Sequence, residues 1–165
     1  MSEQLLPGYW LRAGSEYERS MLVKFIQLAY QELFPQEEDF SHLVRTVNQY
    51  LSRETPLWWV EHDSVEGAGN PSVRRQSVGC IWLGNAIDQV RGDRHVHVFL
   101  LYVMPEHRRQ GLGSQLMRHA ENWAIARGDR QIGLQVFQSN QPALALYHQL
   151  GYQTQSLWMV KPLSP

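Results

Sequence analysis

Residues 96–113 of the chain read VHVFLLYVMPEHRRQGLG. The run from Val96 to Val103 is the most β-prone in the sequence, and Pro105 ends it. Beyond the glycines, apolar residues recur at intervals of three and four, which predicts an amphipathic helix from about Gly111 to Ala126. The stretch therefore predicts a strand, a glycine-rich turn and a helix.

The predicted turn has features that favour binding of a phosphate group. The first backbone N–H groups of a helix have no intrahelical partner, and the helix dipole attracts an anion to that end. Gly111 and Gly113 leave room for a close approach, and Arg108 and Arg109 add positive charge. The pattern lacks the third glycine of a dinucleotide fingerprint and the Gly-Lys-Ser/Thr of a P-loop. Taken alone, it is equally compatible with an ordinary helix start.

The remaining sequence predicts elements on both sides of this stretch. A capping box at Ser15 and Glu18 marks the start of the first helix. The expected elements are a strand at 9–13, helices at about 21–33 and 40–51, strands at 57–61 and 78–83 (the second with an extension to 87 left open), polar loops at 63–77 and 88–94, a strand at 132–137, a helix at 141–150 and a strand at 152–160.

The order of these elements is β-α-α-β-β-β-α-β-α-β. It predicts an α/β (α+β) fold in which a central mixed, mostly antiparallel sheet of about six or seven strands is flanked by about four helices. We expect a single domain over residues 1–165, with its core at 9–160.

The composition excludes several classes of function. With 15 Lys and Arg against 16 Asp and Glu, the net charge of -1 provides no field for binding nucleic acid or an anionic membrane. The single cysteine, Cys80, excludes a disulfide framework and a cysteine-rich zinc site, and we expect it to be a small buried residue. No apolar run is long enough to span a membrane, and Met1 to Gly8 lack the features of a signal peptide. We therefore expect a cytoplasmic protein.

The seven histidines do not indicate a metal site. His95 and His97 lie two positions apart, and His107 and His119 fall on other predicted elements, without an HExxH motif or a carboxylate cluster. We expect no bound metal.

Two segments together resemble the signatures of the GCN5-related N-acetyltransferase (GNAT) superfamily. Residues 101–113 (LYVMPEHRRQGLG) resemble its acetyl-CoA-binding signature, with Arg108, Gly111 and Gly113 at the three defining positions. Residues 140–147 (NQPALALY), followed by Gly151-Tyr152, resemble its second signature. The element order is also similar, so the resemblance extends over about 9–160.

The resemblance implies a role for each matching position. Main-chain groups of Leu101 and Val103 would pair with the pantetheine arm of acetyl-CoA, and backbone amides from Arg109 to Ser114 would hold the pyrophosphate. Asn140 would contact the pantetheine, and Tyr147 would lie beside the thioester sulfur. The expected cofactor-binding residues are Leu101, Tyr102, Val103, Arg108, Arg109, Gln110, Gly111, Leu112, Gly113, Ser114, Asn140, Ala143 and Tyr147.

Attack on a thioester requires a neutral amine, a stabilised oxyanion and a proton for the leaving thiolate. Tyr147 is the candidate acid, because a phenol with a pKa of about 10 can donate to a thiolate whose thiol has a pKa of about 8.5. The alternative for Tyr147 is an ordinary half-buried core tyrosine. The N–H of Val103 is a candidate for the oxyanion, because a bulge in this strand is usual in the family.

His97 is the first candidate for the base. Several family members have a glutamate six residues ahead of the position of Val103, and this chain has His97 there. A histidine with a pKa near 6.5 is a competent base, and strand alternation predicts His95, His97, Phe99 and Leu101 on one face. The alternatives are a half-exposed strand histidine and a water relay.

Glu32 is the second candidate, for the base or for recognition of the amine; its alternative is a solvated glutamate on a helix face. The acidic stretch 36–39 (QEED) could favour a cationic substrate or be a solvated turn. Trp58 and Trp59 point to opposite faces of their strand, so at least one belongs to the core and the other could line an acceptor pocket.

The sequence thus predicts an acetyl-CoA-dependent N-acetyltransferase. The acceptor would be a primary amine of a small molecule or of a protein or peptide, attacking directly in a ternary complex. The alternative is a non-catalytic acyl-CoA-binding sensor or regulatory module. By analogy with the family a homodimer is possible, and the apolar segment 157–160 (LWMV) could support it.

Overall fold

The computed structural model describes residues 1–66 and 72–164. The chain divides into two compact units, Met1–Gln135 and Val136–Pro165. The larger unit holds a β-sheet and three α-helices, and the smaller unit holds one α-helix and the C-terminal segment. The organisation of residues 1–165 as one domain stays a prediction.

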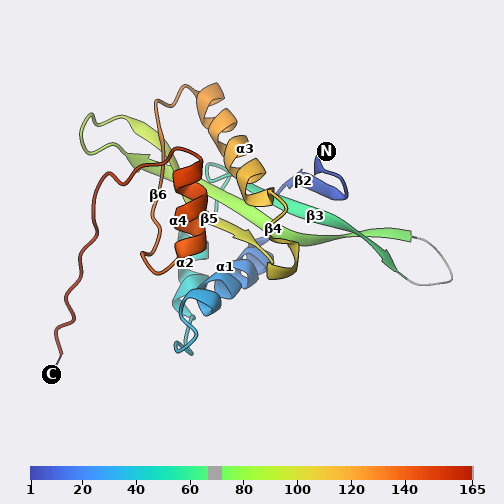
Figure 1. Ribbon diagram of the computed structural model, residues 1–165, viewed down its shortest axis with the longest axis horizontal. Helices are drawn as coiled ribbons and strands as arrows, with labels where there is room; N and C mark the ends of the chain where they lie inside the picture. Colours follow the sequence, from blue (N-terminus) through green and yellow to red (C-terminus); the bar gives the residue numbers. More distant parts are fainter. Residues whose placement is uncertain (67–71, 165) are drawn as a thin grey trace. The chain divides into compact units, whose positions relative to one another are not determined.

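The larger unit contains one six-stranded sheet with the strand order β1-β2-β3-β4-β5-β6. Neighbouring strands run antiparallel except β5 and β6, which are parallel, so the predicted mixed, mostly antiparallel sheet is confirmed. The strands are β1 (Ser2–Leu6), β2 (Tyr9–Ala13), β3 (Leu57–Glu66), β4 (Ser72–Ile87), β5 (Arg94–Val103) and β6 (Ile132–Leu134) (Figure 1).

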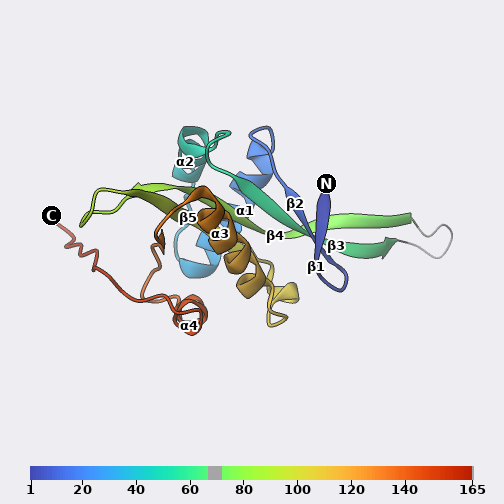
Figure 2. The ribbon, with the colours of Figure 1, turned by 90° about the horizontal axis from the view of Figure 1, so that it is seen from above.

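Helices cover both faces of this sheet. Helices α1 (Arg19–Leu33) and α2 (His42–Tyr50) lie on one face, and α3 (Leu112–Arg127) lies on the other (Figures 1 and 2). Two adjacent residues of β3 mark the two faces. The Trp59 ring contacts Phe25 of α1 with centroids 5.1 Å apart, whereas the Trp58 ring contacts His119 of α3 with centroids 4.6 Å apart. The predicted α/β architecture is therefore confirmed.

Buried apolar side chains fill the space on both faces. The cluster beneath α1 and α2, which we call the α1–α2 core, consists of Leu22, Phe25, Ile26, Phe40, Leu43, Val47, Leu51, Leu57, Trp59, Cys80, Trp82, Leu100 and Tyr102. Helix α3 buries Leu112, Leu116, Met117, Ala120 and Ala124. Cys80 is buried within this core, so it is the small buried residue that the sequence predicts, and its burial raises the pKa of the thiol.

The predicted capping box of Ser15 and Glu18 is only partly confirmed, because α1 begins at Arg19 and its N-cap is Glu18, whose side chain makes no capping hydrogen bond. The Glu18 carboxylate accepts the backbone N–H of Ser15 at 2.8 Å, which is one arm of a capping box. The same carboxylate accepts hydrogen bonds from Arg12 of β2 at 2.8 Å and from the Trp59 indole at 3.2 Å. The helix start is therefore tied to two strands of the sheet.

The predicted polar loop at 63–77 is largely wrong. Strand β3 continues to Glu66 and β4 begins at Ser72, so the two form a long ribbon that extends beyond α1 and α3 (Figure 1). The middle of the expected loop, 67–71, lies outside the described residues. Polar residues stabilise this ribbon through side-chain contacts, including an Arg75–Asp63 ion pair at 3.1 Å. Polarity alone was therefore a misleading signal for a loop, because an antiparallel ribbon can also face water.

The chain ends also differ from the prediction. Residues 2–6 form β1, which pairs with β2 and was not predicted. The predicted last strand at 152–160 is absent: residues 152–164 have no helix or strand, and Leu157, Trp158, Met159 and Val160 are 69–86% exposed. Apolar residues favour a strand only where a pleated partner surface exists, and no described strand pairs with this segment.

Candidate active site

The turn between β5 and α3 has an unusual backbone. A short 3-10 helix, Pro105–His107, follows β5, and Arg109 then adopts a φ of 62°, the positive value that a non-glycine residue rarely takes. Gly111 follows with a φ of 87° and is the N-cap of α3. A residue with a Cβ atom would be strained at this φ, which explains the glycine. Two left-handed residues thus turn the chain sharply into the helix.

The N-terminus of α3 is open. The first helical bond runs from the Gln115 N–H to the Gly111 carbonyl at 3.0 Å. The backbone N–H groups before Gln115 therefore lack helical partners, and within the described part of the chain no side chain caps them. A Cβ atom built on Gly111 would meet no atom within 4 Å. The turn offers converging N–H groups and free space, which is the chemistry that a phosphate group requires.

Arg108 makes the most extensive contacts of the turn. Its Nε donates to the Val103 carbonyl at 2.7 Å, and its Nη2 donates to both carboxylate oxygens of Glu32, at 2.9 and 2.7 Å. The Tyr102 hydroxyl donates to the same Glu32 at 2.8 Å. Burial, and then the hydrogen bond to Glu32, raise the pKa of Tyr102. Arg108, Glu32, Tyr102 and Val103 therefore form one network, which we call the Arg108 network.

Arg109 differs from Arg108 in its contacts. Among the residues that the structure describes, its side chain has no hydrogen bond or ion pair, and it is exposed. Of the two arginines in the predicted signature, Arg108 is bound within the protein and Arg109 remains available to an anion.

Strand β5 has an open edge and a bulge. It pairs with β6 only from Val96 to Val98, so its last five residues have no described strand partner on that side. Opposite β4, the register shifts because Phe99 is an extra residue between Val98 and Leu100. Apart from the Val103 carbonyl, which Arg108 binds, the open edge leaves main-chain groups of β5 available to a ligand that adds as a strand.

The bulge changes the predicted face of β5. Leu100 and Tyr102 belong to the α1–α2 core, on which Phe99 also packs. Alternation after the bulge therefore places Leu101 on the opposite face. The common face predicted for His97, Phe99 and Leu101 holds for the first two and is wrong for Leu101, because a bulge inserts one residue into the alternation.

His97 lies half-buried beside Phe99, with ring centroids 5.7 Å apart. Phe99 in turn contacts Trp82 and Tyr50 of α2, so His97 lies on the face that α1 and α2 cover. Burial, and then the nearby His95, lower the pKa of His97 below its usual value near 6.5. His97 is therefore a neutral imidazole at neutral pH, as a general base requires.

Gly84 of β4 supports this arrangement and was not predicted. It pairs with His97, and a Cβ atom at this position would lie 2.1 Å from the Phe99 ring. A glycine inside an otherwise β-prone run is the sequence signal that could have indicated the close approach.

The smaller unit carries the second predicted signature. Asn140 is the N-cap of α4 (Gln141–Gln149), and its Oδ1 accepts the Ala143 N–H at 3.3 Å. Tyr147 is buried, and burial raises its pKa to about 12. Gly151 has a φ of 94° just beyond the helix. Asn140, Ala143, Tyr147 and Gly151 thus belong to one capped helix.

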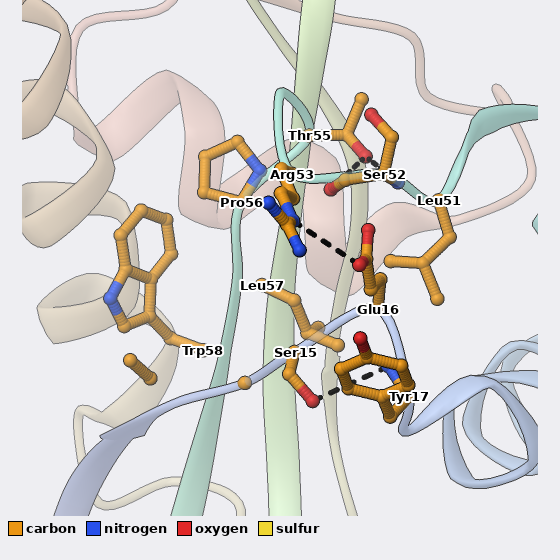
Figure 3. A pocket seen from close by; sticks show the side chains of 12 residues that line it. Ser15, Glu16, Tyr17, Leu51, Ser52, Arg53, Thr55, Pro56, Leu57 and Trp58 are labelled. Atoms are coloured by element: carbon orange, nitrogen blue, oxygen red, sulfur yellow. Dashed lines mark hydrogen bonds and ion pairs between the residues drawn. The ribbon is translucent and has the colours of Figure 1, made fainter.

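A cavity of about 310 Å³ lies between the loop before α1 and the loop before β3. It is lined by residues 13–17 and by seven further residues: Leu51, Ser52, Arg53, Thr55, Pro56, Leu57 and Trp58 (Figure 3).

 Of the two tryptophans of which one could line a pocket, Trp58 lines this cavity and Trp59 belongs to the α1–α2 core. None of the other predicted site residues lines it.

The other predicted candidates are accounted for as follows. In the stretch 36–39, Asp39 accepts the Ser41 backbone N–H at 2.8 Å, and this hydrogen bond lowers the pKa of Asp39. Within the described residues, no group of three or more His, Cys, Asp and Glu side chains could hold a metal ion. No described helix has the length and apolar character needed to cross a membrane.

The structure therefore brings some predicted residues together within each unit. In the larger unit, Glu32 joins Arg108 and Tyr102, and His97 joins Phe99. In the smaller unit, Asn140 and Tyr147 lie on one helix. The contact between Glu32 and Arg108 was missed, because two residues 76 positions apart carry no local signal of their pairing.

Comparison with known proteins agrees with this geometry at the level of fold. A predicted acetyltransferase from Clostridium acetobutylicum, solved with acetyl-CoA, matches with a TM-score of 0.66 and 17% identity, over 93% of this chain and 96% of the other. At this identity the likeness shows the fold.

Two curated relatives match in sequence. N-acetyltransferase family 8 member 3 of Mus musculus is 25% identical over 139 residues, which cover 81% of this chain and 57% of the relative. Thialysine N-epsilon-acetyltransferase of Bos taurus is 37% identical over 60 residues, which cover 36% of this chain and 35% of the relative. The chain thus spans little more than half of one curated relative and about a third of the other.

A longer match shows the family to which the chain belongs. Residues 20–152 match the Acetyltransferase (GNAT) family, and this range includes all but the first residue of α1, the phosphate-type turn and α4. The chain therefore belongs to the acetyltransferase (GNAT) family.

Proposed function

We propose that the chain is an acetyl-CoA-dependent N-acetyltransferase. It would move the acetyl group from the CoA thioester to a primary amine of a small molecule, or of a protein or peptide, by direct attack in a ternary complex. The observation that carries the proposal is the open N-terminus of α3, reached through left-handed Arg109 and Gly111, in a chain of this family. The solved relative that holds acetyl-CoA supports the choice of cofactor.

The binding residues would act through main-chain groups. Backbone amides from Arg109 to Ser114 hold the pyrophosphate, and the Arg109 side chain adds positive charge. The pantetheine arm adds as a strand to the open edge of β5, at Leu101 and Val103. The Asn140 side chain uses its oxygen as a cap and keeps its NH2 group for the pantetheine.

The acid and base would come from different elements. Acetyl-CoA supplies the activated acyl group and the thiolate leaving group. His97 accepts the amine proton, directly or through water, because its lowered pKa keeps it neutral. Tyr147 donates a proton to the thiolate, and its raised pKa keeps the phenol protonated throughout the neutral range. The N–H of Val103 is the candidate donor to the oxyanion.

A second candidate function is a non-catalytic acyl-CoA sensor. The observation that favours it is His97 itself, which stands where several family members have a glutamate. Its lowered pKa also makes His97 a weaker base. The two functions share the phosphate turn, but only the enzyme needs Tyr147 and His97.

Thiol release from acetyl-CoA in the presence of candidate amines tests the proposal. The panel contains polyamines, aminoglycosides, lysine analogues that include thialysine, and peptides with free N-termini or lysines. Release that requires one class of acceptor and is lost in Tyr147→Phe supports the enzyme. Tight acetyl-CoA binding in a calorimeter without release, whichever amine is added, supports the sensor.

A cytoplasmic location and a homodimer complete the proposal. The single free, buried Cys80 fits a reducing compartment. The exposed apolar residues Leu157 to Val160 fit a surface that a second copy covers. Light scattering at several protein concentrations tests the dimer.

A further inference from the structure

Glu32 lies at the C-terminal end of α1, far in sequence from the phosphate turn, yet it contacts the turn directly. Both of its carboxylate oxygens accept from Arg108 Nη2, and Oε1 also accepts from the Tyr102 hydroxyl. A base needs an oxygen that is free to take a proton from the substrate. Glu32 instead uses its oxygens to hold two residues of the protein.

Exposure alone would suggest that the ion pair contributes little. The side chains of Arg108 and Glu32 are 41% and 39% exposed, and exposed pairs usually contribute almost nothing to stability. Two contacts distinguish this pair. The Tyr102 side chain is buried, and its hydroxyl donates to Glu32. The Arg108 guanidinium is held at two atoms, because Nε donates to the Val103 carbonyl and Nη2 donates to Glu32. The pair is therefore part of a connected network on rigid elements.

The network joins three parts of the proposed site. Tyr102 and Val103 are the end of β5, Arg108 is the first signature residue of the turn, and Glu32 belongs to α1. The next residue after Arg108 is Arg109, which must hold a φ of 62° for the N–H groups of α3 to converge. A fixed Arg108 restrains the backbone at the point where this uncommon conformation begins.

We propose that Glu32 is a positioning residue of the acetyl transfer reaction: it holds Arg108 against the end of β5 and so fixes the turn that binds the cofactor pyrophosphate. Arg108 then acts through the geometry of its planar, forked guanidinium group, and Arg109 acts through its charge. This inference rests on the proposed use of acetyl-CoA.

The proposal makes a prediction of unexpected sign. Removing a negative charge near an anion site should by electrostatics alone strengthen the binding of an anion. If Glu32 positions the turn, the Glu32→Gln substitution instead weakens the binding of acetyl-CoA. We expect a roughly fivefold to tenfold loss of acetyl-CoA affinity in calorimetry, the size of effect expected when one ordinary intramolecular hydrogen bond is lost. Glu54→Gln, which removes the same charge from an exposed loop residue, should leave the affinity unchanged.

Two arginine variants separate geometry from charge. Arg108→Lys keeps the charge but loses the fork, so it should weaken binding as much as Arg108→Gln does. Combining Glu32→Gln with Arg108→Gln should cost little more than either change alone, because both break one network. Arg109→Ala should also weaken binding, and its effect should shrink as salt is added.

Turnover provides an independent readout. In Glu32→Gln the KM for acetyl-CoA should rise while kcat changes less, and the pH profile of kcat should keep its wild-type shape. Unchanged or tighter acetyl-CoA binding in Glu32→Gln, with wild-type binding intact, overturns the positioning role and leaves the proposed function standing. A collapse of kcat with unchanged affinity overturns it in favour of a base. Failure of the wild-type protein to bind acetyl-CoA overturns the proposed function and this inference with it.

Discussion

The ring of Phe99 lies so close to Gly84 that a Cβ atom at residue 84 would come within 2.1 Å of two ring carbons. Phe99 is the extra residue of the β5 bulge, and Gly84 is the partner of His97 on β4. The glycine thus makes room for the aromatic ring that His97 contacts. The surroundings of the candidate base depend on the absence of a single methyl group on the neighbouring strand.

Gly84→Ala should therefore displace Phe99 and lower the free energy of unfolding by about 1–3 kcal/mol, the usual cost of overpacking a core. Denaturant unfolding measures this change. Phe99→Leu in the same chain should restore part of the loss, because the smaller side chain leaves space for the added methyl group. An alanine variant as stable as the wild type would show that the ring can move aside at no cost.

His97→Gln should lower kcat by about 100-fold, the lower range for loss of a general base. In the wild type, kcat/KM should fall as the pH drops through the pKa of His97, which lies below its usual value near 6.5. The His97→Gln variant should lose this fall of kcat/KM at acidic pH, the acidic limb of the profile. His119→Gln is the matched control, because burial lowers the pKa of His119 as well but its ring lies on the α3 face. An unchanged acidic limb in His97→Gln would exclude His97 as the base.

The lowered pKa of His97 also predicts how stability varies with pH. Between its lowered folded pKa and the unfolded value of about 6.5, the unfolded chain binds more protons than the folded one. This contribution to the free energy of unfolding is therefore fully present above about pH 6.5, and it is lost as the pH falls through this window. Denaturant unfolding at several pH values should show a smaller acid loss in His97→Gln than in the wild type. The exposed His148→Gln serves as a control, and an equal loss in all three proteins would contradict the prediction.

Tyr147→Phe should lower kcat strongly while the affinity for acetyl-CoA changes little, because it removes only the proton donor. Since the pKa of Tyr147 is raised to about 12, its ionisation should not limit the wild-type rate at any neutral or mildly alkaline pH. Tyr17→Phe, at an exposed tyrosine, is the control. Equal turnover in wild type and Tyr147→Phe would remove the proposed acid.

The strand–turn–helix of residues 96–113 could be predicted because each of its signals is local. The β-prone run, Pro105, the glycines and the helical spacing are read directly from neighbouring residues, and the structure has β5, the turn and α3 in that order. The Asn140 cap and the hydrogen bond between Ser15 and Glu18 were local as well, since each joins residues three positions apart. These parts of the fold needed no knowledge of distant contacts.

The missed features depend on contacts between distant residues. Strand β1 forms because β2 offers it a partner, and the segment 152–160 is not a strand because no described strand pairs with it. The Phe99 bulge depends on β4, and the Arg108 network depends on α1. Composition and spacing could indicate that Arg108 and Glu32 matter, but not that they contact each other.

The most direct test of the central claim is to follow the acetyl group itself. The protein is mixed with acetyl-CoA that carries ¹³C in the acetyl group and with the amine panel, and the products are analysed by mass spectrometry. The proposed function predicts labelled acetyl on the nitrogen of one class of acceptor, and none with Gly113→Trp, which fills the pyrophosphate site. Labelled free acetate without a labelled amine, or equal labelling by Gly113→Trp, would contradict it.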